Sequence, residues 1–522
     1  MRVAITATGV PNDIFGLPDI QLAMLPGTIH VELVERTAWL LSMITSFLDA
    51  PIAEARYRGV STKGAIPMDI VFSSTTQLAA AIRAGHVSSI EVLQAHLAQI
   101  DAHNPTLNAV ITLDAERAYE RAREADAALA RGEYWGPLHG VPFTLKDAHA
   151  TAGMRTTTGF PLLDHVPQVD STVTARLKAA GGILLGKTNV AMMLADYQTT
   201  NPIFGRTNNP WNIERTPGGS SGGAAAALAA GMTPFELGTD LSASIRIPAH
   251  FCGVCGLKPT EQRVPLTGLI PGLPTPRSVR IMSCIGPMAR TVDDLALLYS
   301  IIAGADGRDT EVQPVPVDEV PQLALKHLRV AFAPTFPGLP VAAEICDAVE
   351  ELAKQLSPIC AAVEEATLPQ VDFNQELMNA GALIGMMVGA FQPEEQERPT
   401  TLAQYLEALD RRDQSILAWE RFFEKWDVLL CPPSMVTAFP HCEPGSLLHV
   451  DGQEVSYYMT AAHGTVFNHT GHPAVVLPYK LGRDGLPIGI QVVGKRWDES
   501  RLLAIARAIS EVTGPFQRPP GY

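Results

Sequence analysis

The stretch Ser171-Thr-Val-Thr-Ala-Arg-Leu-Lys-Ala-Ala180 is predicted to form a helix that leads through Gly181-Gly182 into a buried strand, Ile183-Leu-Leu185. Further helices and strands are expected before and after it in the sequence. The pattern predicts helices at 88–100, 115–131 and 224–230, and strands at 141–145 and 235–237. Strands that alternate with helices are typical of an α/β fold. We therefore expect an α/β/α sandwich on a large, twisted, mostly parallel or mixed sheet.

The end of this stretch also matches a phosphate-binding pattern. Gly181-Gly-Ile-Leu-Leu-Gly-Lys-Thr188 fits GxxxxGK[ST] letter for letter. A phosphate loop lies between a strand and the helix that follows it, whereas here the helix comes first and Ile-Leu-Leu is itself the strand. We therefore interpret the match as structural and expect no nucleotide site.

The composition indicates a soluble globular protein. Of the 522 residues 46% are hydrophobic and 18% are charged, which favours a large buried core. The formal net charge of −15 argues against nucleic acid or an anionic membrane as a partner. The N-terminus lacks the apolar region of a signal peptide, and the apolar stretch 37–48 is too short to cross a bilayer, so no membrane insertion is expected.

The seven cysteines favour a reducing compartment. An odd number cannot pair completely, so we expect free thiols and a cytoplasmic protein. Cys252-Gly-Val-Cys255 has no second Cys or His pair at metal spacing, so burial is favoured over zinc binding.

Residues 1–70 are expected to form an N-terminal helical extension before a main domain at 71–522. Apolar residues recur in it at helical spacing: Leu33, Leu40, Leu41, Ile44, Phe47 and Leu48. Membrane docking is the alternative, but this face carries no Lys/Arg cluster. We expect the apolar face to pack against the main body or a second copy in a homodimer.

Three short runs carry the chemistry. They are Gly140-Val-Pro-Phe-Thr-Leu-Lys146-Asp147, Pro217-Gly-Gly-Ser-Ser-Gly-Gly223 and Gly238-Thr-Asp-Leu-Ser-Ala-Ser-Ile-Arg-Ile-Pro-Ala249. In this order and spacing, the chain resembles the amidase signature family, serine hydrolases with a Ser–cis-Ser–Lys triad. The resemblance extends from about Ser73 to about Gly514.

The resemblance implies a role for three residues. Ser244 is the expected nucleophile and Ser220 the bridging serine, which in this family follows a cis peptide bond, here from Gly219. Lys146 is the expected base and must be neutral to act, although a solvated lysine has a pKa of about 10.4. Because it follows an apolar strand that enters the interior, burial should lower its pKa. No metal or organic cofactor is implied.

The resemblance also implies supporting groups. The expected oxyanion donors are the backbone N–H groups of residues 241–244, and the expected supporting side chains belong to residues around the serines. The donors are those of Leu241, Ser242, Ala243 and Ser244, and the supporting residues are Ser221, Asp240 and Arg246. The family commonly has Gly-Gly where this chain has Ser242-Ala243. The added side chains narrow the space over the scissile carbonyl.

A rival interpretation places the nucleophile at Ser220. Gly218-Gly-Ser-Ser-Gly222 fits GxSxG, the nucleophile elbow of α/β-hydrolases, which needs a strand before the serine and a downstream histidine. The preceding residues 211–217 end in proline and do not resemble a strand. The candidate histidines are His441, His463 and His472.

The region 370–450 resembles nothing closely and is expected to build much of the substrate pocket. Its apolar residues indicate either an adaptable pocket or a helix buried in the core. They are Leu377, Met378, Ile384, Met386, Met387 and Phe391.

We thus expect an amidohydrolase that cleaves a C–N bond of a small, apolar amide, carbamate or ester through an acyl-enzyme. One alternative is the glutaminase subunit of a tRNA-dependent amidotransferase, which works in a complex. The extra N-terminal segment and the apolar 370–390 region favour the free-standing hydrolase. Another alternative is a catalytically inactive binding protein on the same fold, which the presence of all three triad residues disfavours.

Overall fold

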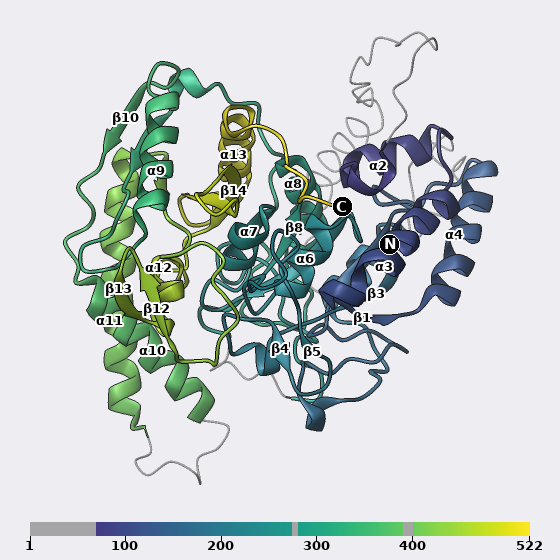
Figure 1. Ribbon diagram of the computed structural model, residues 1–522, viewed down its shortest axis with the longest axis horizontal. Helices are drawn as coiled ribbons and strands as arrows, with labels where there is room; N and C mark the ends of the chain where they lie inside the picture. Colours follow the sequence, from purple (N-terminus) through teal and green to yellow (C-terminus); the bar gives the residue numbers. More distant parts are fainter. Residues whose placement is uncertain (1–68, 274–279, 390–399) are drawn as a thin grey trace, which may run out of the picture. The chain divides into compact units, whose positions relative to one another are not determined.

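A computed structural model describes residues 69–273, 280–389 and 400–522 (Figure 1). Residues from Asp69 to Tyr522 form one unit. The helix expected within 1–70 lies outside the described residues.

An eight-stranded mixed sheet forms the centre of this unit. Its strand order is β10-β9-β11-β15-β14-β7-β8-β6. β9 pairs parallel with β10 and β11, and the other neighbouring pairs are antiparallel. The strands are β6 (Phe235–Asp240), β7 (Cys255–Lys258), β8 (Cys284–Ala289), β9 (Arg329–Phe332), β10 (Ala362–Glu365), β11 (Val428–Cys431), β14 (Ala474–Leu481) and β15 (Pro487–Val493).

The α/β prediction is confirmed, and of the two sheet types expected the mixed one is found. A mostly parallel sheet is not, because β14 and β15 form an antiparallel hairpin that reverses the chain direction at the centre. Such hairpins need only a short connection, unlike parallel pairs.

Successive side chains of a strand point to opposite faces of the sheet, and a hydrophobic core covers each face. On β15, Ile488, Ile490 and Val492 join one core, whereas Val493 joins another on the opposite face. The first core contains residues of α8 (Val292–Ile302), α9 (Ala343–Leu356) and α13 (Glu499–Thr513). Opposite them lie α6 (Gly222–Ala229), α7 (Arg246–Cys252) and α12 (Ala462–His469). The layers are therefore helix, sheet, helix.

A second, three-stranded sheet adjoins the large one. Its order is β1-β3-β2, with β2 (Pro142–Lys146) parallel to β3 (Ile183–Thr188) and β1 (Val110–Leu113) antiparallel to β3. β2 lies against β6, where the Phe143 and Phe235 rings stack with centroids 5.0 Å apart. Because Gly186-Lys187-Thr188 belongs to β3 itself, the phosphate-loop match is structural.

The helices expected around this sheet are present, with ends within a few residues except at the C-terminus of α3. They are α3 (Ser89–Leu107), α4 (Ala115–Ala130), α5 (Thr172–Ala179) and α6. The Ser88 side chain caps α3 by accepting from the Glu91 N–H, and the Glu91 carboxylate accepts from the Ser88 N–H. This reciprocal capping fixes where the helix begins. The remaining described α-helix before them is α2 (Thr75–Arg83).

The region that resembled nothing closely contains two long helices and the sheet strand β11. α10 (Phe373–Gly389) packs against α11 (Leu402–Lys425) and α12. Along α10, Met387 is buried whereas Met378 is 67% exposed. Met387 therefore lies in the core and Met378 at the surface, the pocket stays a prediction, and Phe391 lies outside the described residues. A small hairpin, β12 (Leu447–Val450) and β13 (Gln453–Ser456), follows α11.

Candidate active site

Lys146 is the last residue of β2, and its side chain is fully buried. Its Nζ lies 2.8 Å from Ser220 Oγ, 2.7 Å from Ser221 Oγ and 2.7 Å from Thr239 Oγ1. The structure thus brings two of the three predicted runs together at one nitrogen, and Thr239 comes from the third run.

Ser220 and Ser221 lie directly before α6. The peptide bond between Gly219 and Ser220 is cis, as expected, and Ser220 is fully buried. A Cβ added at Gly219 would come within 2.5 Å of the Asp196 carbonyl oxygen, so only glycine fits there. The glycines of this run therefore allow the close approach of two loops.

Ser244 lies in the turn from β6 into α7 and is buried, with 7% of its surface exposed. Its carbonyl oxygen accepts a hydrogen bond of 3.3 Å from the Ser221 N–H. This bond places the turn of the third run beside the start of α6.

The surroundings of Lys146 favour the neutral amine. Burial lowers the pKa of Lys146 to about 7, against the opposing charges of Asp240 and Glu236. A neutral amine has two N–H bonds and one lone pair. Three hydroxyl groups surround Nζ, so two can accept its N–H bonds while the third donates to its lone pair. The site can therefore hold a lysine that accepts a proton from Ser220.

Glu236 lies behind the lysine. It is fully buried, and its Oε2 accepts the N–H of Lys146 at 3.1 Å and that of Leu237 at 3.1 Å. Burial raises the pKa of Glu236 to about 7. Lys146 and Glu236 therefore titrate in the same range.

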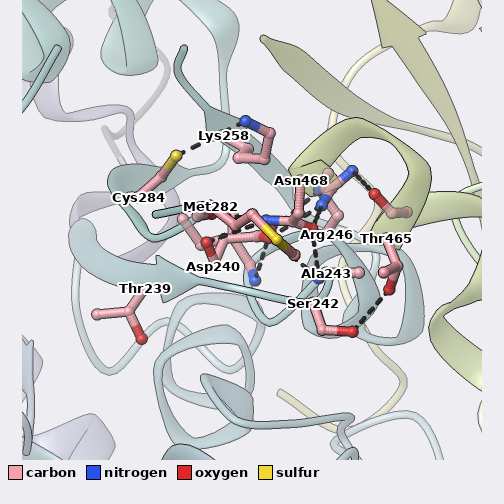
Figure 2. A network of polar contacts seen from close by, with 12 residues as sticks. Thr239, Asp240, Ser242, Ala243, Arg246, Lys258, Met282, Cys284, Thr465 and Asn468 are labelled. Carbon is pink, nitrogen blue, oxygen red and sulfur yellow. Dashed lines mark hydrogen bonds and ion pairs between the residues drawn. The ribbon is translucent and has the colours of Figure 1, made fainter. Parts of the chain in front are cut away.

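A buried ion pair holds the turn that carries Ser244 (Figure 2). Asp240 accepts from Arg246 through both carboxylate oxygens, at 2.9 and 3.0 Å. Burial alone would raise the pKa of Asp240, but the charge and hydrogen bonds of Arg246 outweigh it and lower the pKa to about 2. The carboxylate therefore remains charged, and it also accepts the Ile245 N–H at 3.1 Å.

One of the four expected oxyanion donors already has acceptors within the protein. The Ala243 N–H donates to Asp240 Oδ1 at 3.0 Å and to Asn468 Oδ1 at 3.2 Å, so it is already engaged. Asp240 lies three residues before Ala243, and its carboxylate accepts this N–H across the turn.

Comparison with known proteins identifies the family. The Amidase family model matches residues 91–388 and 382–503. The chain belongs to the amidase family. A glutamyl-tRNA(Gln) amidotransferase subunit of Moorella thermoacetica is 34% identical over 495 residues, which cover 87% of this chain and 99% of that protein. The corresponding subunit of Roseiflexus sp. is 35% identical over 84% of this chain and 96% of its own length.

Solved structures of amidase signature enzymes share the fold. A bacterial aryl acylamidase of that family matches with a TM-score of 0.77 and 25% identity, over 86% of this chain and 99% of its own. A 6-aminohexanoate cyclic dimer hydrolase matches with a TM-score of 0.73 and 29% identity, over 86% and 99%. This amidase is accordingly a hydrolase that acts on carbon–nitrogen bonds.

Three residues of the candidate site were missed from the sequence. Thr239 precedes Asp240 in a quoted run, but nothing marked its hydroxyl as a lysine partner. Asn468 accepts from Arg246 Nη2 at 2.5 Å, and Gln491 accepts from Arg246 Nη1 at 2.7 Å. Both lie over 200 residues away in sequence, on α12 and β15, so no local pattern could indicate them.

The structure shows contacts of all three histidines of the rival interpretation, two through the ring and one through the backbone. The His463 ring packs on Phe336 with centroids 5.3 Å apart, and His472 Nδ1 lies 2.9 Å from Thr470 Oγ1. The backbone N–H of His441 donates to the Glu214 carbonyl. Residues 211–217 contain no strand, so a nucleophile elbow at Ser220 lacks its preceding strand.

The cysteines are free, and Cys252 and Cys255 are buried as predicted. Within residues 69–273, 280–389 and 400–522, no group of three or more His, Cys, Asp and Glu residues is arranged to hold a metal ion. In the same described part of the chain, no helix is long and apolar enough to cross a bilayer.

Proposed function

We propose that this amidase hydrolyses a small apolar amide through an acyl-enzyme on Ser244, with Ser220 as the bridging serine and Lys146 as the base. The observation that supports the proposal best is the 2.8 Å contact between Lys146 Nζ and Ser220 Oγ in a fully buried setting. A lysine with a pKa of about 7 is neutral in a large fraction of molecules at neutral pH.

Acylation then proceeds by two proton transfers and one bond formation. Lys146 takes the proton of Ser220 Oγ, which takes the proton of Ser244 Oγ as that oxygen attacks the carbonyl carbon. When the tetrahedral intermediate collapses, the C–N bond breaks. The proton returns from Lys146 through Ser220 to the departing amine.

Backbone N–H groups stabilise the negative oxygen of the intermediate. With the Ala243 N–H engaged, the proposed donors are those of Leu241, Ser242 and Ser244. Deacylation repeats the sequence with water: the same lysine and bridging serine take its proton, the hydroxide oxygen attacks the ester carbon, and Ser244 leaves with the proton restored.

Apolar side chains beside the Ser244 turn support an apolar substrate. A small buried cluster joins α10, α11 and Met282, and Leu241 of the turn packs against it. Its other partly buried members are Ile281, Ile384, Met386, Tyr405 and Leu409. Such a surface suits the hydrocarbon part of an amide, and the same chemistry serves carbamates and esters.

The second candidate is the glutaminase subunit of a tRNA-dependent amidotransferase. The 34% identity to a glutamyl-tRNA(Gln) amidotransferase subunit over 99% of its length favours it. A polar glutamine side chain gains little from the apolar cluster beside Leu241, which is why we prefer the free-standing enzyme.

A substrate panel tests the proposal. We expect release of product from chromogenic anilides, carbamates or esters by the purified chain alone, and labelling of Ser244 by a fluorophosphonate probe. Ser244→Ala is the matched control and should be neither labelled nor active. Activity confined to glutamine and to a complex with copurifying subunits would favour the second candidate, and an unlabelled wild type would contradict both.

A further inference from the structure

The Ser244 turn of this amidase carries two side chains where the family commonly has glycines. Ser242 Oγ lies 2.6 Å from Thr465 Oγ1 (Figure 2). It also lies 3.1 Å from the Tyr197 hydroxyl. These contacts link three hydroxyl groups from separate parts of the chain: the segment before the cis peptide, the turn, and α12. A glycine at 242 could make neither contact.

Both ends of this hydroxyl chain are anchored. The Tyr197 N–H donates to Asp196 Oδ1, and the ring lies 5.8 Å from that of Tyr457. At the other end, Thr465 is 7% exposed and follows Gly464, whose carbonyl oxygen accepts from Arg246 Nη1 at 2.8 Å. Neither anchor can shift without disturbing other contacts.

The hydroxyl chain acts on the backbone that carries the proposed oxyanion donors. The peptide unit after Ser242 is held at its nitrogen, because the Ala243 N–H donates to Asp240 and Asn468. The contacts of Ser242 Oγ with Thr465 and Tyr197 hold Ser242 through its side chain. Together these bonds limit the rotation of the peptide units on either side of Ser242, and so fix the direction of its own N–H.

We propose that Ser242 is a positioning residue, whose hydroxyl chain to Tyr197 and Thr465 holds the oxyanion donors in their working direction. The inference rests on the proposed function. Donors that are already oriented stabilise a developing charge without reorganising during the reaction. Loss of the chain should therefore weaken transition-state binding more than substrate binding.

The test removes one hydroxyl at a time without changing shape. Thr465→Val is close to isosteric and breaks the 2.6 Å contact, and Thr465→Ser retains it. We expect Thr465→Val to lower kcat about three- to tenfold with KM within about twofold. The inhibition constant of a boronic acid, which forms a tetrahedral adduct on the nucleophile, should rise by the same factor. Thr465→Ser should remain close to wild type.

A matched control breaks a similar contact elsewhere. Thr174→Val removes a buried hydroxyl of α5 that lies 2.7 Å from Ser171 Oγ and 3.0 Å from the Ala150 carbonyl oxygen, and should leave both kcat and boronic acid inhibition unchanged. If Thr465→Val fails to fold, Tyr197→Phe breaks the other contact of Ser242 and should show the same split.

The outcomes separate the inference from the proposed function. Wild-type values of kcat and boronic acid inhibition in both Thr465→Val and Tyr197→Phe would overturn the inference, as would a change confined to KM. A wild type that forms no adduct on Ser244 would instead overturn the proposed function.

Discussion

Lys146 must be neutral to accept a proton, and this requirement predicts an acidic limb in the pH profile. Burial lowers its pKa to about 7, so protonation removes the base as the pH falls through that value. We expect kcat/KM for an unactivated amide to decline below about pH 7. Lys146→Ala should lose most activity, and Lys146→Arg should not restore it, because arginine stays protonated.

The control for this prediction is Glu236, whose pKa is also about 7. Glu236→Gln removes that titration while keeping an oxygen that can accept the Lys146 N–H. A limb that persists in Glu236→Gln belongs to the lysine. Substantial activity in Lys146→Arg would mean that the base lies elsewhere, for which the C-terminal histidines are the first candidates.

Ser244→Ala and Ser220→Ala distinguish the two possible nucleophiles by their effect on kcat. Ser244→Ala removes the atom that forms the acyl-enzyme, so we expect a loss on the order of 10³-fold or more in kcat. Single-turnover acylation and probe labelling measure it. If Ser244→Ala were nearly normal and Ser220→Ala inactive, the nucleophile would be Ser220 after all.

The residues of the site divide into those that local sequence could predict and those that it could not. Lys146, Ser220 and Ser244 each lie in a short run whose glycines and spacing are recognisable. Asn468 and Gln491 act through contacts with Arg246 that form only when α12 and β15 pack against the turn. The engagement of the Ala243 N–H could not be predicted either, because it depends on how the turn folds.

At the scale of elements, α12 fits the turn through a small residue. Gly464 faces the Ala243 Cβ, and a Cβ added at Gly464 would come within 2.4 Å of it. Alanine in a helix interior is normally favoured over glycine by about 1 kcal/mol. Here we expect the opposite: Gly464→Ala should lower the free energy of unfolding by about 1–3 kcal/mol through overpacking.

Ala243→Gly provides the partner variant for a double-mutant cycle. Ala243 has a φ of 62°, where alanine is strained. Glycine would relieve the strain but loses more conformational freedom on folding, so Ala243→Gly alone should change the free energy of unfolding little. Combined with Gly464→Ala it removes the clash, and we expect a coupling of about 0.5–3 kcal/mol in denaturant unfolding. Additive effects would show that the two residues do not interact.

The sequence predicts helices and strands better than it predicts the direction and neighbours of each strand. Helices such as α3 and α4 are recognisable because capping and apolar periodicity are local. The direction of each strand is not, because β15 lies between β11 and β14, and β8 between β7 and β6. Those neighbours are set by how the chain returns to the sheet, which a stretch such as 171–185 does not contain.

For the whole molecule, buried titratable groups predict a stability that decreases as the pH is lowered. Burial is the first cause that lowers the pKa of seven buried histidines: His96, His139, His149, His250, His463, His469 and His472. Below about pH 6.5 these side chains are protonated in the unfolded chain but not in the folded one. Each therefore lowers the free energy of unfolding as the pH falls toward its folded pKa.

Buried carboxyl groups oppose this effect in part. Burial raises the pKa of Asp147 to about 6 and the pKa values of Glu236 and Glu376 to about 7, so the folded state holds these protons more tightly. The buried histidines outnumber the buried carboxyl groups whose pKa values reach about 6 or 7, so we expect a net uptake of protons on unfolding between pH 6 and 5. Each proton corresponds to about 1.4 kcal/mol per pH unit.

We therefore expect the urea midpoint to fall steeply as the pH is lowered from 6.5 to 5, with proton uptake on unfolding that a pH-stat can measure. His463 offers the sharpest variant, because its ring packs on Phe336 and neither ring nitrogen has a hydrogen-bond partner among the described residues. His463→Phe should reduce the uptake by about one proton. An uptake that is unchanged in His463→Phe would mean that this histidine is already protonated in the folded protein, and that the aromatic cluster around it admits charge.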